Sequence, residues 1–199
     1  MKLLLATKNP GKLRELRALV GDLFQIASLD DHPGPEVDET GETFEENARL
    51  KALAHSARTG LPTLADDSGL CVDALGGAPG VRSARYAAGT DADRIEKLLS
   101  ELRAVPDERR GAEFRCALCL ALPSGETIVE VGECRGRIIA EPRGRNGFGY
   151  DPIFFIPELG RTMAELAPEE KGRISHRARA LAKVMPHLRR LAEQHRSPR

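Results

Sequence analysis

Glu39, Asp66 and Asp67 are the acidic side chains whose types and spacing best suit a divalent cation. Mg²⁺ is usually held by one or two carboxylates together with phosphate oxygens of a substrate, so this group predicts phosphate chemistry. Asp66 and Asp67 are adjacent in an expected strand, where side chains alternate between the two faces. A regular strand therefore directs only one of them to the site, and parity does not say which. The alternative is a solvated strand end or an Asx turn before Gly69.

The turn at residues 7–12 is a candidate phosphate-binding element. A strand-to-helix turn presents backbone N–H groups and the positive end of the helix dipole, which both suit an anion. Lys8 and Lys12 add positive charge. The turn is not a P-loop, because that motif requires Gly where Ala6 stands and Ser or Thr where Leu13 stands. An ordinary capped helix with surface lysines is the other interpretation.

Two later segments could contact the rest of a nucleotide. Glycines on both sides of Phe148, within residues 147–152, would let the backbone approach a ligand while Phe148 stacks on a base. A glycine-rich turn whose aromatic side chains cover the core is the alternative. Lys171 and the Ser-His-Arg run at 175–177 lie where the last helix is expected to begin. Helix stability favours acids there, so these donors indicate anion or carbonyl binding, unless they are basic residues on a solvated helix.

The four cysteines do not predict a metal site. Cys116 and Cys119 form a C-x-x-C pair inside an apolar run that is expected to be a strand. Residues three apart on a strand face opposite sides and cannot chelate one ion. The sequence has no second pair or nearby histidine to complete such a site. We interpret the cysteines as reduced core residues, which excludes a structural zinc protein.

The bulk composition argues against two other classes of protein. Lys plus Arg and Asp plus Glu both number 30, so a nucleic-acid binder that depends on excess positive charge is not expected. The longest apolar run near the centre, at 116–122, is far shorter than a membrane span. The apolar run at the N-terminus is too short for a signal peptide. We expect a cytoplasmic protein with no nucleic-acid or membrane partner and a single domain over residues 1–199.

Two capped helices are expected to position the first candidate residues. A buried strand at residues 3–6 leads into a helix with Asn9 as its N-cap, Pro10 as its first residue and an apolar stripe that reaches Leu23. After an acidic loop, a second helix begins behind a Thr-x-x-Glu capping box at residues 43–46 and ends at residue 60, a glycine.

The rest of the chain is expected to complete a mixed α/β fold, because a hairpin occurs beside βα units. The expected elements are a strand at 63–74, a glycine-rich loop at 76–89, a helix around 95–102, a hairpin of 113–122 with 126–135, extended chain within 136–157, and a helical tail from residue 174 with a kink or break at Pro186.

Six segments taken together resemble the inosine triphosphate pyrophosphatase family, whose bacterial members are called XTP/dITP diphosphatases. They follow the family order from about residue 3 to about residue 190, and several are individually specific. The segments are residues 6–12 (ATKNPGK), 39–48 (ETGETFEENA), 65–70 (ADDSGL), 76–80 with 83–86 (GGAPG and SARY), 148–152 (FGYDP) and 175–177 (SHR). The resemblance implies an elongated mixed β-sheet flanked by helices, two lobes with a central substrate groove, and a homodimer.

The resemblance also implies roles for single residues. Asp67 matches the catalytic acid, which accepts a proton and approaches the metal, and Glu39 matches a second metal-associated acid. Asp66 is the reserve candidate for the base. The implied cofactor is Mg²⁺, one or more ions per subunit, with Mn²⁺ as a substitute. The implied substrate-binding positions are Thr7, Lys8, Asn9, Pro10, Gly11, Lys12, Ser68, Phe148, Gly149, Tyr150, Asp151, Lys171, His176 and Arg177.

The implied activity is hydrolysis of deaminated purine nucleoside triphosphates (ITP, dITP, XTP) to the monophosphate and pyrophosphate, which keeps them out of DNA and RNA. Water would attack the α-phosphorus while Lys12 and Lys171 offset phosphate charge. Arg177, which only donates hydrogen bonds, would match a 6-keto group and not a 6-amino group. Guanine also carries a 6-keto group, so rejection of GTP requires a further feature that opposes its 2-amino group. Two rivals stay open: a binding module without turnover, and a phosphohydrolase with another cleavage position or base preference.

Overall fold

The computed structural model describes residues 1–196. Contacts within the chain define two compact units, one made of Met1–Asp67, Cys116–Gly132 and Arg177–Arg199, the other of Ser68–Arg115 and Glu133–His176. Three strands contribute residues to both units. The expectation of a single domain over residues 1–199 stays a prediction, and its last three residues lie outside the described range.

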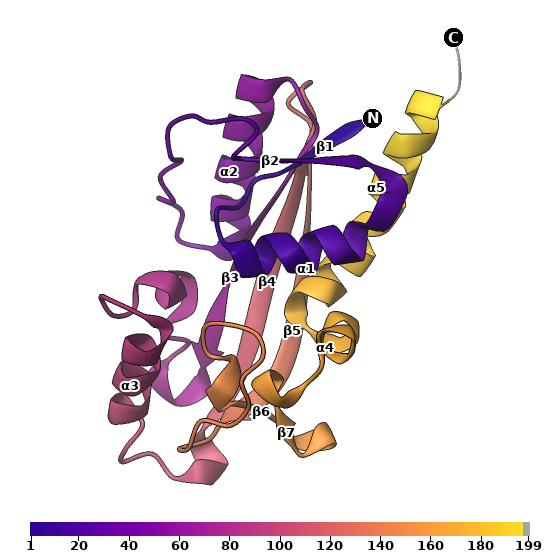
Figure 1. Ribbon diagram of the computed structural model, residues 1–199. Helices are drawn as coiled ribbons and strands as arrows, with labels where there is room; N and C mark the ends of the chain where they lie inside the picture. Colours follow the sequence, from indigo (N-terminus) through magenta and orange to yellow (C-terminus); the bar gives the residue numbers. More distant parts are fainter. Residues whose placement is uncertain (197–199) are drawn as a thin grey trace. The chain divides into compact units, whose positions relative to one another are not determined.

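Within the described residues the strands form one seven-stranded sheet in the order β2-β1-β3-β4-β5-β6-β7. β1 pairs in parallel with β2 and β3, whereas β6 pairs antiparallel with β5 and β7. The expected mixed α/β sheet is therefore confirmed. The strands, labelled in Figure 1 where there is room, are β1 (Lys2–Leu5), β2 (Gln25–Ser28), β3 (Thr63–Val72), β4 (Gly111–Ala121), β5 (Thr127–Ile138), β6 (Phe154–Ile156) and β7 (Arg161–Thr162).

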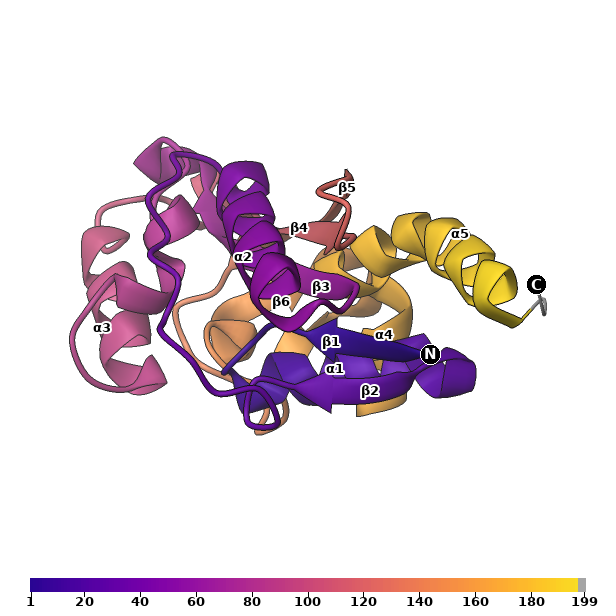
Figure 2. The same ribbon diagram turned by 90° about the horizontal axis from the view of Figure 1, so that it is seen from above.

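Helices cover both faces of the sheet in the first unit. Figure 2 shows α1 (Pro10–Val20) and α2 (Phe44–Thr59) on opposite sides of β1. The core on one face joins α1 and the sheet to α5 (His176–Arg196), and it consists of Leu3, Leu5, Leu16, Val20, Phe24, Leu64, Cys116, Leu118, Leu120, Ala180, Leu181, Val184, Leu188, Leu191 and Ala192. α2 buries the small residues Ala48 and Ala52. Both faces of the strands are thus withdrawn from water, as their continuous apolar sequence predicts.

The second unit has its own apolar core, built around the other ends of β3, β4 and β5. Its helices are α3 (Asp91–Glu101) and α4 (Pro168–Ile174). The core consists of Leu70, Val72, Leu98, Leu102, Ala112, Phe114, Cys134, Ile138, Tyr150, Ile153, Phe154, Ile156, Met163 and Leu166. No helix within residues 1–196 has the length and apolar character that a bilayer crossing requires.

The expected helix caps are confirmed. The side chain of Asn9 accepts hydrogen bonds from the first-turn amides of α1, and Pro10 is the first helical residue. Thr43 and Glu46 form the reciprocal capping box of α2. Gly60 ends α2 in the left-handed conformation, with φ 67°. Each of these signals acts within a few residues, so the sequence alone is enough to find it.

Other boundaries differ from expectation because tertiary contacts or glycine decide them. β2 was not expected, since its four residues show no alternation, and it forms by pairing in parallel with β1. α1 ends at Val20 because Gly21 takes a positive φ of 62°, so Leu23 lies in a 3₁₀ turn and not in the helix. β3 ends at Val72, two residues before its expected end, where a second 3₁₀ turn follows.

The C-terminal helix also differs from expectation. The tail helix expected from residue 174 begins at His176 as α5, and the short helix α4, which was not expected, precedes it; Ser175, with extended backbone angles, separates the two. Lys171 therefore belongs to α4, whereas Arg177 lies in the first turn of α5. α5 continues past Pro186, so of the expected kink or break the break does not occur, and the kink stays a prediction. All four cysteines are free, and three of them are buried, as expected for core residues.

Gly60 tests the capping argument. A Cβ added there would meet nothing within 4 Å, so space does not require the glycine. We expect Gly60→Ala to lower the free energy of unfolding by about 1 kcal/mol through backbone strain alone. Gly60→Asn should cost less, because asparagine tolerates the left-handed conformation. Urea denaturation of both variants measures this, and equal losses for alanine and asparagine would contradict the backbone explanation.

Candidate active site

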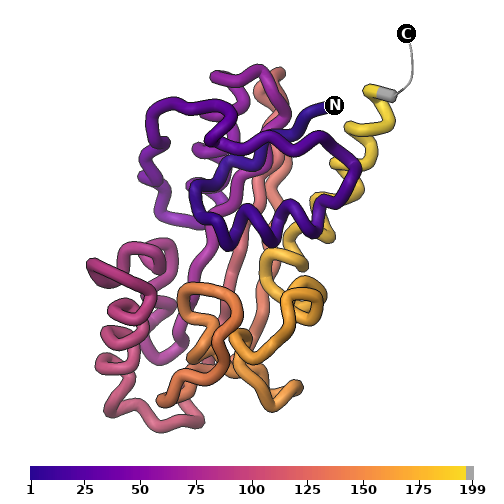
Figure 3. The backbone as a smooth tube through the Cα atoms, in the orientation of Figure 1, coloured from indigo at the N-terminus to yellow at the C-terminus, as the bar shows by residue number. Residues whose placement is uncertain are grey.

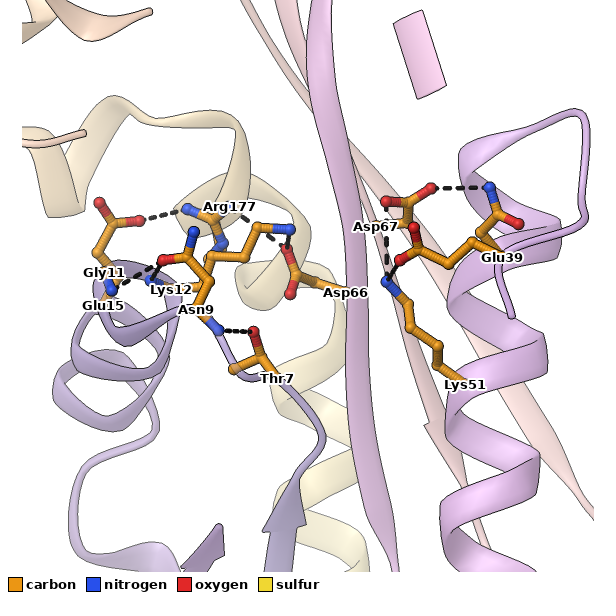
Figure 4. A network of polar contacts seen from close by, with 11 residues as sticks. Thr7, Asn9, Gly11, Lys12, Glu15, Glu39, Lys51, Asp66, Asp67 and Arg177 are labelled. Carbon is orange, nitrogen blue, oxygen red and sulfur yellow. Dashed lines mark hydrogen bonds and ion pairs between the residues drawn. The ribbon is translucent and has the colours of Figure 1, made fainter. Parts of the chain in front are cut away.

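Asp66 and Asp67 lie on opposite faces of β3 (Figure 4). The strand is regular at this point, so its alternation separates two neighbouring carboxylates. Both are almost fully buried, with exposed fractions of 1% for Asp66 and 6% for Asp67. Two buried acids need two separate sets of compensating groups. The sequence did not predict which helices each aspartate faces, and the structure places Asp66 and Asp67 against different ones.

Asp66 faces the N-terminal part of α1 and the start of α5. Its Oδ2 lies 2.9 Å from the ammonium of Lys12 and 3.3 Å from the guanidinium of Arg177. Arg177 also donates to Glu15 of α1. The guanidinium is almost completely withdrawn from solvent, with 1% of the residue exposed. Asp66 therefore belongs to a buried network of two acids and two bases (Figure 4).

This network keeps Asp66 ionised. Burial alone would raise the pKa of the Asp66 carboxyl, but the nearby charges of Lys12, Arg177 and Lys51 outweigh it and hold that pKa well below its ordinary value. Burial acts against the charged form of Arg177 too, yet Asp66 and Glu15 raise the pKa of its guanidinium. A carboxylate with so low a pKa is a weak proton acceptor. Asp66 is thus suited to holding cations in place.

The backbone amides of the opening turn already have partners. The side chain of Asn9 accepts from the amides of Gly11 at 2.8 Å and Lys12 at 3.1 Å, while Thr7 Oγ1 accepts from the Asn9 amide at 3.2 Å. Lys8 is exposed and pairs with Glu36 at 3.3 Å. An anion that binds these amides would have to replace the Asn9 cap. The positive helix end and the ammonium of Lys12 are the features here that favour an anion.

Asp67 faces α2 and the segment that precedes it. The ammonium of Lys51 lies 2.5 Å from Glu39 Oε1 and 3.8 Å from Asp67 Oδ1, so one cation bridges the two acids (Figure 4). The side-chain amide of Asn47 donates to Asp67 Oδ2 at 3.0 Å. The structure therefore brings together Glu39 and Asp67, which the sequence predicted as a pair, and adds two residues from α2.

The electrostatic setting of Asp67 is opposite to that of Asp66. Burial raises the pKa of the Asp67 carboxyl, Glu39 raises it further, and Lys51, Lys12 and the hydrogen bond from Asn47 offset only part of this. Burial acts to lower the pKa of Lys51, but Asp66, Asp67 and Glu39 raise it overall, so the ammonium stays charged. A carboxylate with a raised pKa accepts a proton more readily. Of the two aspartates, Asp67 has the environment of a base.

The segment that carries Glu39 is held by one face of α2. Residues 29–43 form no helix or strand, and Figure 3 follows their path from β2 to α2. Contacts come from helix positions spaced by four and seven residues, which share one face: Arg58 donates to the carbonyl of His32 at 3.0 Å, Lys51 holds Glu39, and Asn47 binds the backbone of Gly41. The segment thus runs antiparallel to α2.

His55 completes this helix face between Lys51 and Arg58. Its Nδ1 lies 3.0 Å from the Arg58 guanidinium, which can only donate, so Nδ1 accepts and the proton is on Nε2. Burial lowers the pKa of His55, and the positive charges of Arg58, Lys51 and Lys8 lower it further. The imidazole is therefore neutral at neutral pH, as its bond with Arg58 requires.

Glu39 and Asp67 are chemically suited to a hard divalent cation. Their oxygens already face one shared positive charge, the Lys51 ammonium. Within residues 1–196 no group of three or more His, Cys, Asp or Glu side chains is arranged to hold a metal ion. Mg²⁺ does not need such a group, because it commonly takes one or two protein carboxylates and completes its shell with water and phosphate oxygens. The donor set therefore fits Mg²⁺ bound together with a phosphate.

A second polar cluster lies in the other unit, around Lys171. Its ammonium is 2.6 Å from Asp151 Oδ2, and both residues are buried. The same oxygen accepts from the Phe148 amide at 2.9 Å. The ammonium also lies 4.7 Å from the centre of the Phe148 ring, a cation–π contact. Gly147 has φ 78°, and a Cβ there would approach Asp151 to 2.0 Å, so this turn requires glycine.

The remaining predicted residues of this unit are mostly structural in their contacts. Tyr150 is buried and donates to the carbonyl of Ser83 at 2.9 Å, which fixes the aromatic turn to the unit's core. The Gly149 amide donates to Asp91 at 2.7 Å. His176 is buried, and its ring stacks on Phe114 with centroids 4.9 Å apart. Ser68, half-buried, is the first residue of this unit.

Sequence reasoning missed Asn47 and Lys51. Both lie on the α2 face that also carries His55, with a spacing of four residues, and this face is polar although Ala48 and Ala52 beside it are buried. Polar residues at helical spacing next to buried alanines are a usable signal, because a buried polar group requires a partner. Glu15 gave no comparable signal, since its partner is far away in the sequence.

Comparison with known proteins adds independent information. The model of the Ham1 family matches residues 3–187. A dITP/XTP pyrophosphatase of Symbiobacterium thermophilum is 55% identical over 194 residues, which cover 97% of this chain and 98% of the relative. A dITP/XTP pyrophosphatase of Geobacillus kaustophilus is 57% identical over 187 residues, covering 92% of each.

Solved structures agree with the sequence matches. A HAM1 protein from Coxiella burnetii superposes with a TM-score of 0.87 at 46% identity, covering 94% of this chain and 98% of the other. A nucleoside-triphosphatase / dITP/XTP pyrophosphatase from Mycobacterium abscessus has a TM-score of 0.75 at 49% identity, covering 95% and 100%. The family resemblance seen in the sequence is confirmed. By sequence and by structure, this chain belongs to the Ham1 family.

Proposed function

We propose that the protein hydrolyses deaminated purine nucleoside triphosphates, ITP, dITP and XTP, to the nucleoside monophosphate and pyrophosphate, and so keeps these nucleotides out of DNA and RNA. The observation that supports this best is the pair of Glu39 and Asp67 around the Lys51 ammonium. Two carboxylates suit the metal ion that accompanies a polyphosphate, and a lysine ammonium beside them suits its negatively charged oxygens. Relatives that are more than half identical over almost their whole length are named dITP/XTP pyrophosphatases.

In this mechanism Asp67 orients and deprotonates the water that attacks the α-phosphorus. Its raised pKa favours proton transfer, whereas Asp66, held ionised by Lys12 and Arg177, keeps those cations in place. Lys51, Lys12 and Lys171 offset negative charge on the phosphates. Phe148, whose ring already contacts a cation, offers a face for stacking on the base. Thr7, Asn9 and Ser68 are proposed as further substrate contacts.

Mg²⁺ is the proposed cofactor, with Mn²⁺ as a substitute. Glu39 and Asp67 would hold it. When bound, the ion would supply Lewis acidity, which offsets phosphate charge and makes the attacking water more acidic. We further propose a homodimer that acts on free nucleotides in the cytoplasm. Equal numbers of basic and acidic residues, 30 of each, favour a small nucleotide over a nucleic acid as the partner.

The bond that is cleaved can be tested directly. With Mg²⁺, we expect ITP to give IMP and pyrophosphate in one step, because the acids and lysines are proposed to act at the α-phosphorus. Phosphorus NMR should detect pyrophosphate without accumulation of IDP, and a sample with EDTA should show neither product. IDP with orthophosphate would indicate another class of phosphohydrolase, and turnover in EDTA would remove the metal from the mechanism. The same assay with ATP and with GTP measures the preference for the base.

Asp66→Asn and Asp67→Asn form a matched pair, because they remove the same charge from neighbouring positions. We expect Asp67→Asn to lower kcat by about 10²-fold or more, with unfolding changed by no more than about 1 kcal/mol. Asp66→Asn should cost about 3–5 kcal/mol of stability, because Lys12 and Arg177 would lose their buried partner. Kinetics and urea denaturation of both variants give the comparison.

The pH dependence of stability checks the same assignment. The pKa of Asp66 is depressed in the folded protein, so its contribution is complete above the ordinary carboxyl pKa and declines as pH falls toward the folded value. The stability gap between wild type and Asp66→Asn should therefore narrow in acid. A gap that is the same at neutral and acid pH, or an Asp67→Asn variant as unstable as Asp66→Asn, would contradict the division of roles.

Base choice is assigned to Arg177, whose guanidinium would donate to a 6-keto oxygen. Because Arg177 also pairs with Glu15 and Asp66, its removal destabilises the protein, so the ratio of kcat/KM for ITP to that for ATP is the appropriate measure. This ratio does not depend on the folded fraction. We expect Arg177→Ala to lower the ratio by about 10²-fold, or about 2.7 kcal/mol. Lys171→Ala, assigned to phosphate, should leave it unchanged. An unchanged ratio in Arg177→Ala would exclude base reading by this side chain.

A further inference from the structure

Asn47 of α2 uses its whole side-chain amide in contacts with the two parts of the candidate acid site. Its Oδ1 accepts from the Gly41 amide at 2.8 Å. Its Nδ2 donates to the Gly41 carbonyl at 3.3 Å and to Asp67 Oδ2 at 3.0 Å. The residue is 2% exposed. An asparagine amide has two N–H donors, and here one binds the segment that carries Glu39 while the other binds Asp67.

The contact with Gly41 fixes the backbone in two directions at once. The amide and the carbonyl of Gly41 are both bound, so neither of the two peptide groups that flank its Cα can rotate without losing a hydrogen bond. The approach is also close: a Cβ on Gly41 would lie 2.6 Å from Glu46 Cβ and 2.8 Å from Asn47 Oδ1. Only glycine fits between the segment and the helix at this point. Glu39 is two residues away, which leaves its backbone little freedom.

Asn47 differs in kind from Lys51, which is also on α2 and also contacts Asp67. Lys51 contacts both acids, but through a flexible ammonium that can follow either carboxylate. Asn47 has a short side chain with two rotatable bonds, and all its polar atoms are engaged. A short, buried and fully bonded side chain transmits position, whereas a long lysine mainly supplies charge.

From this geometry we propose that Asn47 is a positioning residue that fixes Asp67 and the Glu39 segment relative to each other. The inference rests on the proposed function for its catalytic consequence, but the structural link itself is independent of it. Asn47 would not touch the reacting atoms. Its loss should therefore reduce kcat through misplacement of Asp67, while the substrate contacts that determine KM are kept.

Asn47→Ala tests the proposal, with Glu46→Ala as the matched control. Glu46 binds the amides of Glu42 and Thr43, and removing it weakens the same helix end without touching Asp67. We expect Asn47→Ala to lower kcat by about 10- to 100-fold, since misplacement by about 1 Å costs that much. KM should stay within about threefold, and Glu46→Ala should keep kcat within about twofold. Asn47→Ser, which retains a hydroxyl, replaces Asn47→Ala if the alanine variant does not fold.

A double-mutant cycle with Asp67→Asn separates positioning from general destabilisation. If Asn47 acts through Asp67, adding Asn47→Ala to Asp67→Asn should reduce kcat by no more than about twofold. If Asn47→Ala instead lowered kcat through general destabilisation, its loss of kcat would multiply with the loss already caused by Asp67→Asn. Full multiplication of the two losses, or equal kcat losses in Asn47→Ala and Glu46→Ala, would overturn the proposal.

Amide hydrogen exchange gives a readout that does not require activity. In Asn47→Ala the Gly41 amide should exchange faster by about tenfold or more, whereas in Glu46→Ala the faster amides should be those of Glu42 and Thr43. Unchanged exchange at Gly41 would show that Asn47 does not hold the segment. If the wild-type protein released no pyrophosphate from ITP, the proposed function would fail, and the exchange result would still decide whether Asn47 links the two elements.

Discussion

The alternation of side chains along β3 is the constraint on which the rest of the site depends. Two adjacent aspartates on a buried strand must face opposite sides of the sheet, and both are almost fully withdrawn from bulk solvent, where an uncompensated charge is costly. The fold therefore has to supply cations on both faces. α1 and α5 supply Lys12 and Arg177 to Asp66, and α2 supplies Lys51 to Asp67. Helices that cover the two faces are thus needed for the charges as well as for the apolar core.

Asp66 and Asp67 have the same side chain but different acidity, because nearby cations compensate their negative charges to different extents. Asp66 shares Oδ2 with two cations, which keeps it charged and holds two helices to the sheet. Asp67 lies farther from the ammonium of its ion-pair partner Lys51 and has the carboxylate of Glu39 nearby, so burial prevails and the pKa of Asp67 rises. The neighbours, and not the residue type, decide which aspartate is able to take a proton.

The sequence predicted the local features well and the distant ones poorly. The caps at Asn9 and Thr43 and the end of α2 at Gly60 depend on neighbours within a few residues, and all were found. β2 exists because β1 lies beside it, and no local pattern marks it. The Glu39–Asp67 pairing was expected through a family resemblance, whereas the pairing of Glu15 with Arg177 joins residues far apart in the sequence and was not. The alternation of side chains along a strand predicted that Asp66 and Asp67 face opposite sides of the sheet. It could not predict which side each one faces, because that depends on which helix covers which face.

The pairing of Glu39 with Asp67 depends on local features of α2 that are themselves outside the pair. Asp67 is fixed by a strand inside the sheet, but Glu39 lies in a segment with no secondary structure of its own. Its place is set by the α2 face that carries Asn47 and Lys51. The direction of that face depends on the phase of the helix, which begins at the capping box and ends at the left-handed glycine. A shift of one residue in α2 would rotate this face by about 100°, and the two acids would no longer share a cation. The phase of α2 is therefore part of the construction of the acid pair, whereas the loss of one capping side chain, such as that of Glu46, weakens the helix end without changing this phase.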